Sequence, residues 1–226
     1  MGIVATRQND MVSGLMAEYA LGSLSEPVRV LMESHLELSS DARSWLSDIE
    51  TVGSVVSADK PMRFDTHVLD AVEPVDLSDR DASLDAIWKM IDSDPKADDE
   101  ASSMPKALQS YIGMPMADVP WKSVMPGLAE YKLPEKNGAE VSLIRIDSGK
   151  AVPVHTHHGA EITLVLQGGV SDESGHYGVG YIALADDDIN HKPLADKGEV
   201  CICFAVVDAP VELTGPIGRL MNSFRR

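Results

Sequence analysis

The sequence predicts an α+β protein with two domains, a small all-α domain followed by an all-β domain. In the first part of the chain, apolar side chains recur at spacings of three and four, which is the pattern of amphipathic helices. After Met114, short runs rich in β-branched residues alternate with glycine turns, which is typical of a closed barrel or jelly roll. We therefore place a helical domain at residues 1–97, a linker at 98–113 and a β domain at 114–226.

Four helices are expected in the N-terminal domain. Serine, asparagine and aspartate at their starts are the residues that cap helices, and proline in the second helix falls in its first turn. The expected helices are residues 10–23 with Asn9 or Asp10 as the cap, a helix after Ser25, a helix after Ser39 and Ser40, and residues 84–91.

Three β-rich runs mark the C-terminal domain: residues 141–146, 162–166 and 200–207. Val, Ile and Thr predominate in them, and glycines separate them, so each is expected to be a strand. The composition of residues 172–175, Asp-Glu-Ser-Gly, predicts a hairpin turn.

The charge balance limits the function classes. The 226 residues carry a net charge of −17, which argues against direct binding of nucleic acid and is compatible with a basic protein partner. No stretch approaches the ~20 apolar residues of a membrane helix, and the start of the chain lacks the basic-then-apolar order of a secretory signal. Two cysteines, Cys201 and Cys203, are too few for a disulfide framework. We expect a cytoplasmic protein with no membrane contact.

A cluster of metal-ligating residue types lies between Gly149 and Gly168, in the pattern G-x5-H-x-H-x3-E-x6-G. His155 and His157 are two positions apart, so on a strand their side chains project from the same face. Glu161 begins an apolar strand, where burial of an unpaired carboxylate is costly unless a metal compensates it. With His191 further along the chain, these residues form a donor set that divalent metals favour.

This pattern resembles the first conserved motif of the cupin superfamily, and the segment from Gly175 to His191 resembles the second. The second motif departs from the family pattern, because Asp186–Asp188 and Asn190 stand where the family has P-x-G before its histidine. The resemblance implies a small β-barrel that holds one metal per chain. The implied ligands are His155, His157, Glu161 and His191.

The metal's identity stays open at this point. Three histidines and a carboxylate suit zinc, iron, manganese and nickel, and we take zinc as the first expectation. Four protein ligands would fill a tetrahedral zinc site, which favours a structural or sensing role. Six-coordinate iron or manganese would keep two open positions and could be catalytic. His158 and His176 are expected to lie on the surface or beside the site, not to bind the metal.

The two cysteines admit two interpretations. Cys201 and Cys203 are two apart on an expected strand, so they face the same way and are poorly placed for a disulfide. They are small apolar side chains of a barrel core, or they form a thiol pair near the metal that responds to oxidants.

The helical domain carries a second resemblance. Residues 14–26 and 28–38 are similar to the N-terminal domain of ChrR-type anti-sigma factors, and the barrel segment, including the later C-x-C, is also similar to theirs. The family's zinc motif in that domain is H-x3-C-x2-C. This chain keeps His35 but has Ser39 and Ala42 at the cysteine positions, and no histidine precedes His35. We therefore expect a helical domain that folds without metal, with His35 as a half-buried remnant.

The resemblance implies a transcriptional regulator that binds and inhibits an extracytoplasmic-function sigma factor, with a cupin domain that senses oxidative stress and no catalytic residues. Residues 1–97 contain 8 basic and 18 acidic side chains, so this domain could complement the basic surface with which a sigma factor contacts DNA. The alternative from another class is a cupin metalloenzyme, such as an iron-dependent dioxygenase, with a helical appendage.

Overall fold

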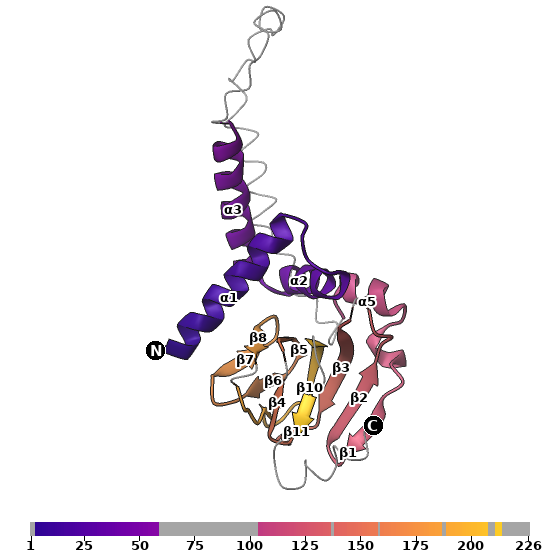
Figure 1. Ribbon diagram of the computed structural model, residues 1–226. Helices are drawn as coiled ribbons and strands as arrows, with labels where there is room; N and C mark the ends of the chain where they lie inside the picture. Colours follow the sequence, from indigo (N-terminus) through magenta and orange to yellow (C-terminus); the bar gives the residue numbers. More distant parts are fainter. Residues whose placement is uncertain are drawn as a thin grey trace, which may run out of the picture. The chain divides into compact units, whose positions relative to one another are not determined.

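The computed structural model describes residues 3–58, 104–136, 138–157, 159–186, 189–207 and 211–213. Within these ranges, helices in the N-terminal part precede antiparallel sheets in the C-terminal part, so the predicted fold class is confirmed (Figure 1). The fourth expected helix, at residues 84–91, lies outside the described residues. None of the described helices combines the length and the apolar character that crossing a membrane requires.

In the described part of the chain, three helices precede the sheets, and a short helix and a 3-10 turn lead into them. They are α1 (Ile3–Ala20), α2 (Glu26–Leu38), α3 (Ser40–Ala58), α5 (Lys106–Ile112) and the turn Met116–Asp118. Helix α5 falls in the range where the sequence suggested a linker, and the domain boundaries stay a prediction. The described residues up to Thr51 belong to the same compact unit as the strands.

Helix α1 begins at Ile3, so the predicted start at residue 10 was wrong. Asn9 and Asp10 are good caps, but inside a helix they cost only a few tenths of a kcal/mol relative to other polar residues. The favourable residues before them let the helix continue through. In α2 the prediction was right: Ser25 is the N-cap in extended conformation, proline follows in the first turn, and Ser39 is the C-cap.

Among the residues that the structure describes, the strands form three antiparallel sheets. Their bounds are β1 (Lys122–Met125), β2 (Leu128–Lys132), β3 (Glu140–Ile146), β4 (His155–His157), β5 (Glu161–Gln167), β6 (Gly169–Ser171), β7 (His176–Gly178), β8 (Ile182–Ala185), β9 (Leu194–Ala195), β10 (Cys201–Val207) and β11 (Val211–Leu213). The large sheet has the order β1-β2-β3-β10-β5-β8, and the smaller ones are β7-β6-β9 and β11-β4. The three β-rich runs are β3, β5 and β10, as predicted. Residues 172–175 form the expected hairpin turn between β6 and β7.

Strand β10 is buried over its full length because both of its faces are covered. Cys201 and Cys203 point to the barrel interior, where they pack with residues such as Val165. The alternate residues, including Ile202 and Phe204, belong to the core on the helical side of the sheet. A strand buried on both faces reads as a continuous apolar run, which is the pattern that this segment has.

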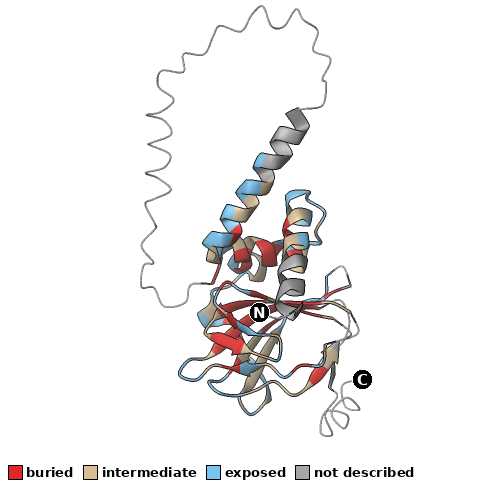
Figure 2. Ribbon diagram, turned by 90° about the vertical axis from the view of Figure 1, so that its left-hand side faces the viewer, coloured by how far each residue is buried: buried red, intermediate tan, exposed pale blue. Residues whose placement is uncertain are grey.

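Helices α2 and α5 cover the outer face of the large sheet (Figures 1 and 2). Leu31 and Met32 of α2 and Leu108 of α5 are 0% exposed. Full burial of one such side chain contributes roughly 1.5–3 kcal/mol. The carboxylate of Glu37 in α2 accepts hydrogen bonds from the backbone N–H groups of Lys106 and Ala107, at 2.8 and 2.9 Å. It thereby caps the start of α5, whose N-cap position holds proline.

Candidate metal centre

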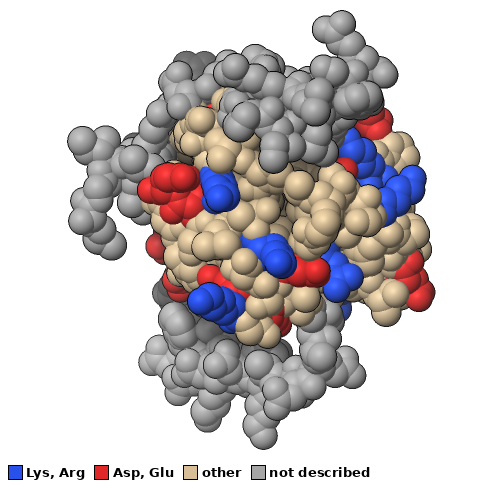
Figure 3. All heavy atoms as spheres, turned by 90° about the horizontal axis from the view of Figure 1, so that it is seen from below, with Lys and Arg blue, Asp and Glu red and all other residues tan. Residues whose placement is uncertain are grey.

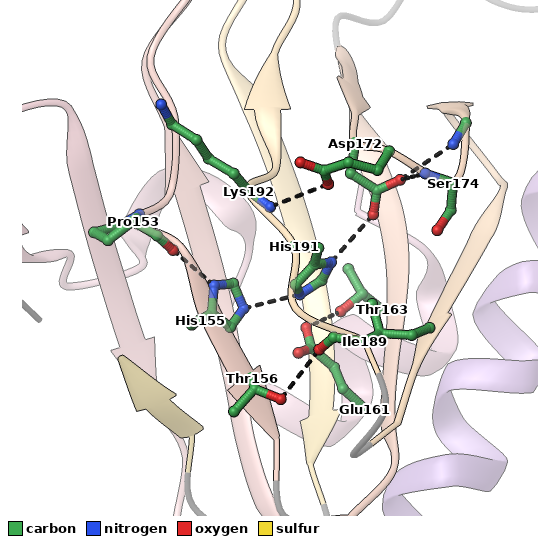
Figure 4. Close-up of polar contacts among 12 residues, drawn as sticks. Pro153, His155, Thr156, Glu161, Thr163, Asp172, Ser174, Ile189, His191 and Lys192 are labelled. Atoms are coloured by element: carbon green, nitrogen blue, oxygen red, sulfur yellow. Dashed lines mark hydrogen bonds and ion pairs between the residues drawn. The ribbon is translucent and has the colours of Figure 1, made fainter. Parts of the chain in front are cut away.

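Three of the four predicted metal ligands lie together inside the barrel (Figure 4). His155 and Glu161 are the first residues of β4 and β5. His191 joins them through a bridge in which its backbone exchanges two hydrogen bonds with that of His155, of 3.1 and 3.2 Å. All three are buried, at 5%, 9% and 7% exposure, and their ligand atoms lie within 4.8 Å of one another.

Each imidazole is oriented by a hydrogen bond at Nδ1. For His155 the partner is the backbone carbonyl of Pro153 at 2.8 Å, and for His191 it is a carboxylate oxygen of Asp172 at 3.1 Å. A carbonyl or carboxylate oxygen accepts, so Nδ1 of each ring is the donor. The Nε2 atoms of the two rings then face each other at 3.0 Å.

With a proton on each Nδ1, the two Nε2 lone pairs face each other, an arrangement that a proton or a metal ion between them stabilises. Two nitrogens bound to one ion at about 2.1 Å are roughly 3.0–3.4 Å apart, which the observed 3.0 Å fits. Metal-binding histidines donate their other ring N–H to a carbonyl or a carboxylate, as both rings do here. The donor set therefore fits a divalent cation.

Glu161 supplies the negative charge of the cluster. The hydroxyl of Thr163 donates to its Oε1 at 2.7 Å and so orients the carboxylate. Burial of a carboxylate beside a thiol and two imidazoles is costly without a cation. This residue is thus placed as the sequence indicated, at the start of an apolar strand.

The fourth predicted ligand, His157, is described only in its backbone, which pairs with Val211. Its side chain and the whole of His158 lie outside the description, so the assignment of His157 stays a prediction. His176 is more than half exposed, and its Nε2 pairs with Asp196 at 2.8 Å. It is not among the clustered ligands.

Asp172 is a functional candidate that the sequence argument missed. One carboxylate oxygen bonds His191, and the other accepts the backbone N–H groups of Ser174 and Gly175 at 2.8 and 3.1 Å. Burial alone would raise the pKa of Asp172, but the hydrogen bonds from His191 and from the turn lower it below the ordinary value. The sequence predicted the turn, and only the fold brings the turn's aspartate to a histidine nineteen positions away.

The clustered residues line a cavity of about 70 Å³ whose other walls are mainly apolar. A second cavity of about 420 Å³ shares His155 and Glu161 and is lined by residues of β1, β2, β3 and β10. The site is therefore a small polar centre in apolar surroundings, which strengthens its electrostatic interactions.

Cys203 lines the same small cavity, and its Sγ lies 3.6 Å from that of Cys201. Both thiols are free and buried. The hydrogen bond with Cys201, then burial and then the charge of Glu161 raise the pKa of Cys203 well above its ordinary value. Cys203 is thus protonated at neutral pH and packs as a small core side chain beside the clustered residues, and both interpretations of this pair stay predictions.

Comparison with known proteins agrees with this architecture. Residues 109–210 match the family described as the ChrR cupin-like domain. The anti-sigma-E factor ChrR of Cereibacter sphaeroides is 32% identical over 232 residues, which cover 98% of this chain and 99% of that protein.

A solved structure extends the match to three dimensions. One chain of the crystal structure of Rhodobacter sphaeroides SigE in complex with the anti-sigma ChrR superimposes with a TM-score of 0.60 and 33% identity. The match covers 87% of this chain and 96% of that one. The similarity runs through both the helices and the barrel, and this chain belongs to the family of the anti-sigma factor ChrR.

Proposed function

We propose that this chain is an anti-sigma factor that binds and inhibits an extracytoplasmic-function sigma factor in the cytoplasm. One observation carries the proposal: the similarity to ChrR covers nearly the whole chain and includes the helical region as well as the barrel. A shared barrel alone would support only a shared fold.

The charge distribution is compatible with such a partner. The first 97 residues carry a net charge of −10, which complements a basic surface. In the view of Figure 3, the described basic side chains are interspersed with acidic ones. The surface pairs Lys132–Glu140 and Arg145–Asp147 are examples of this mixing. Such a surface gives little attraction for nucleic acid.

We further propose that the barrel holds one divalent metal, zinc in the first place, on His155, His157, Glu161 and His191. The support is the pair of Nε2 atoms that face each other beside a buried carboxylate. The metal would supply the positive charge that this cluster needs. The chain's own part is to orient both rings through Pro153 and Asp172 and to surround the site with apolar walls.

A sensing role for this site fits its construction. Its members come from separate strands and turns, so a chemical change at the site alters how those elements pack. Oxidative stress is the signal that we propose, because the imidazole side chains that line the site are oxidisable.

Co-expression with the extracytoplasmic-function sigma factors of the source organism tests the proposal. We expect one of them to copurify with the full-length chain at one to one and to lose transcriptional activity in its presence. If none copurifies and none is inhibited, the proposed function is wrong. The inhibition must weaken when the helical region is exchanged for an unrelated helical sequence of similar charge.

The enzyme alternative has less support, since the relative that spans the chain is a regulator. Metal analysis of protein purified without added metal separates the two further. Zinc at one per chain favours the sensor, and iron with oxygen uptake on addition of small carbonyl compounds would favour a dioxygenase.

A further inference from the structure

The end of α2 and the start of α3 border a cavity of about 540 Å³. His35, Ser39 and Ala42 line one side of it, and the turn at residues 179–181, between β7 and β8 of the barrel, lines the other. The residue that the sequence suggested to be a half-buried remnant is buried, at 8% exposure. The barrel thus contributes one wall of this cavity.

His35 makes a direct contact with this turn. Its Nδ1 donates to the backbone carbonyl of Gly180 at 2.7 Å, across 145 positions of sequence. Burial lowers the pKa of His35, so the ring is neutral at pH 7, and the proton lies on Nδ1 because a carbonyl only accepts. One hydrogen bond of this kind contributes about 1 kcal/mol, and a buried one is costly to break.

Gly180 is required at this contact for two independent reasons. Its φ is +81°, in the left-handed region that side chains disfavour. A Cβ at this position would also lie 3.2 Å from both the Cβ and the carbonyl oxygen of Leu38, the last residue of α2. The close approach of α2 to the 179–181 turn is therefore a built feature of the fold.

The same turn is tied to the metal centre by one pair of strands. The N–H of Gly180 donates to the carbonyl of Val165 in β5, and the N–H of Val165 donates to Tyr181. At the opposite end of this pair, Glu161 of β5 lies opposite Ala185 of β8, and both line the metal cavity. A shift of β8 against β5 at the cavity therefore reaches the turn within a few residues.

The helices depend on the barrel for their own core. Leu31 and Met32 in α2 are fully buried in the cluster that also contains Leu164 of β5 and Phe204 of β10. A helical region this small needs such an outside support. The contact at Gly180 sets where the end of α2 lies on that support.

We propose that the His35–Gly180 contact fixes the end of α2 on the barrel and transmits the state of the barrel's metal site to α2. Loss of the cation leaves Glu161 and two facing imidazoles uncompensated. The ends of β5 and β8 then move apart, the 179–181 turn shifts, and α2 loses its fixed position. This inference rests on the proposed function, since the consequence of a loosened α2 is release of the sigma factor.

Amide hydrogen exchange of the full-length chain, with and without Zn²⁺, tests this coupling and needs no sigma factor. In the wild type, we expect removal of Zn²⁺ by EDTA to speed exchange in α2 by about tenfold or more. In Gly180→Ala, α2 should exchange fast in both conditions. The matched control is Gly178→Ala, because Gly178 has no positive φ and a Cβ there meets nothing within 4 Å. It should behave as the wild type.

His35→Ala removes the hydrogen bond together with the buried ring but leaves the backbone of the 179–181 turn unchanged, and it carries the test if Gly180→Ala does not fold. It should raise exchange in α2 in the same direction and lower its response to Zn²⁺. Two results would overturn the inference. The first is an exchange rate in α2 of the wild type that does not change when Zn²⁺ is removed. The second is an exchange rate in α2 that is the same in Gly180→Ala as in Gly178→Ala. Either result leaves the copurification of a sigma factor, and with it the proposed function, untouched.

Discussion

Two histidines in this chain have the same hydrogen bond and different surroundings. His155 donates from Nδ1 to a backbone carbonyl at 2.8 Å, and His35 does so at 2.7 Å. Beyond the ring, His155 faces His191 and Glu161. The described lining of the cavity at His35 holds one carboxylate, that of Asp41, and no second imidazole or thiol. An oriented imidazole is common to both sites. The donor groups around each ring decide which of the two sites fits a metal.

Among the tests of the difference between the His155 and His35 sites, removal of a clustered ligand has the largest expected effect. His191→Ala should weaken Zn²⁺ binding by more than about 100-fold, because even loss of a ligand's hydrogen-bonding partner costs 10–100-fold. His35→Ala should weaken it by less than about tenfold, and His176→Ala should leave it unchanged. Competition with a chromophoric chelator measures all three. Equal losses for His191→Ala and His35→Ala would contradict the distinction between the two sites.

The stability of the helices that pack on the barrel should depend on their buried apolar side chains, not on metal ligands. Leu31→Ala should lower the free energy of unfolding by about 3 kcal/mol, because the side chain is fully buried and leaves a cavity. Leu21→Ala is the control, since Leu21 is 81% exposed, and it should change stability by less than about 0.5 kcal/mol. Denaturant unfolding followed by circular dichroism measures both. A Leu31→Ala protein as stable as the wild type would show that α2 does not rely on the barrel.

Asp172→Asn separates the carboxylate partner of His191 from the ligands themselves. The substitution should lower Zn²⁺ affinity by about 10–100-fold, since the carboxylate strengthens the ligand and fixes its orientation. Asp196→Asn is matched to it, because Asp196 pairs with the exposed His176. Zinc titration of both variants against the wild type should show an effect in the first alone. An unchanged affinity in Asp172→Asn would reduce Asp172 to a residue of the turn.

Much of the metal cluster could be predicted because its signal is local. His155 and Glu161 lie six positions apart, at the starts of strands that glycines and β-branched residues mark out. His191 entered as a distant fourth donor, and the family resemblance assigned it as a ligand, since its bridge to His155 joins distant positions. The three main strands followed from composition. The start of α1 did not, because good capping residues can also lie inside a helix.

The contacts that connect the parts could not be predicted. Asp172 was recognised as a turn residue, and nothing in its neighbours indicates that the turn folds over His191. The pairing of His35 with Gly180 spans 145 positions. Gly180 looks like any turn glycine in the sequence, and only its distance to Leu38 reveals a tight packing contact. Long-range geometry of this kind depends on how sheets and helices pack, which a local pattern does not encode.

The pH dependence of stability gives the smallest and most specific test of the His35 site. Burial lowers the pKa of His35 from 6.5, so below pH 6.5 the unfolded chain binds a proton at this residue that the folded chain does not. The wild type should therefore lose stability relative to His35→Gln as the pH falls below 6.5, by at most about 1.4 kcal/mol per pH unit, until the folded-state pKa is reached. Denaturant unfolding of both proteins in EDTA measures the difference in their free energies of unfolding without metal binding. The other histidines are present in both proteins, so their contributions cancel in this difference. A difference that stays constant from pH 7.5 to 5 would mean that His35 is as accessible to protons in the fold as in the unfolded chain, which its buried contact with Gly180 does not allow.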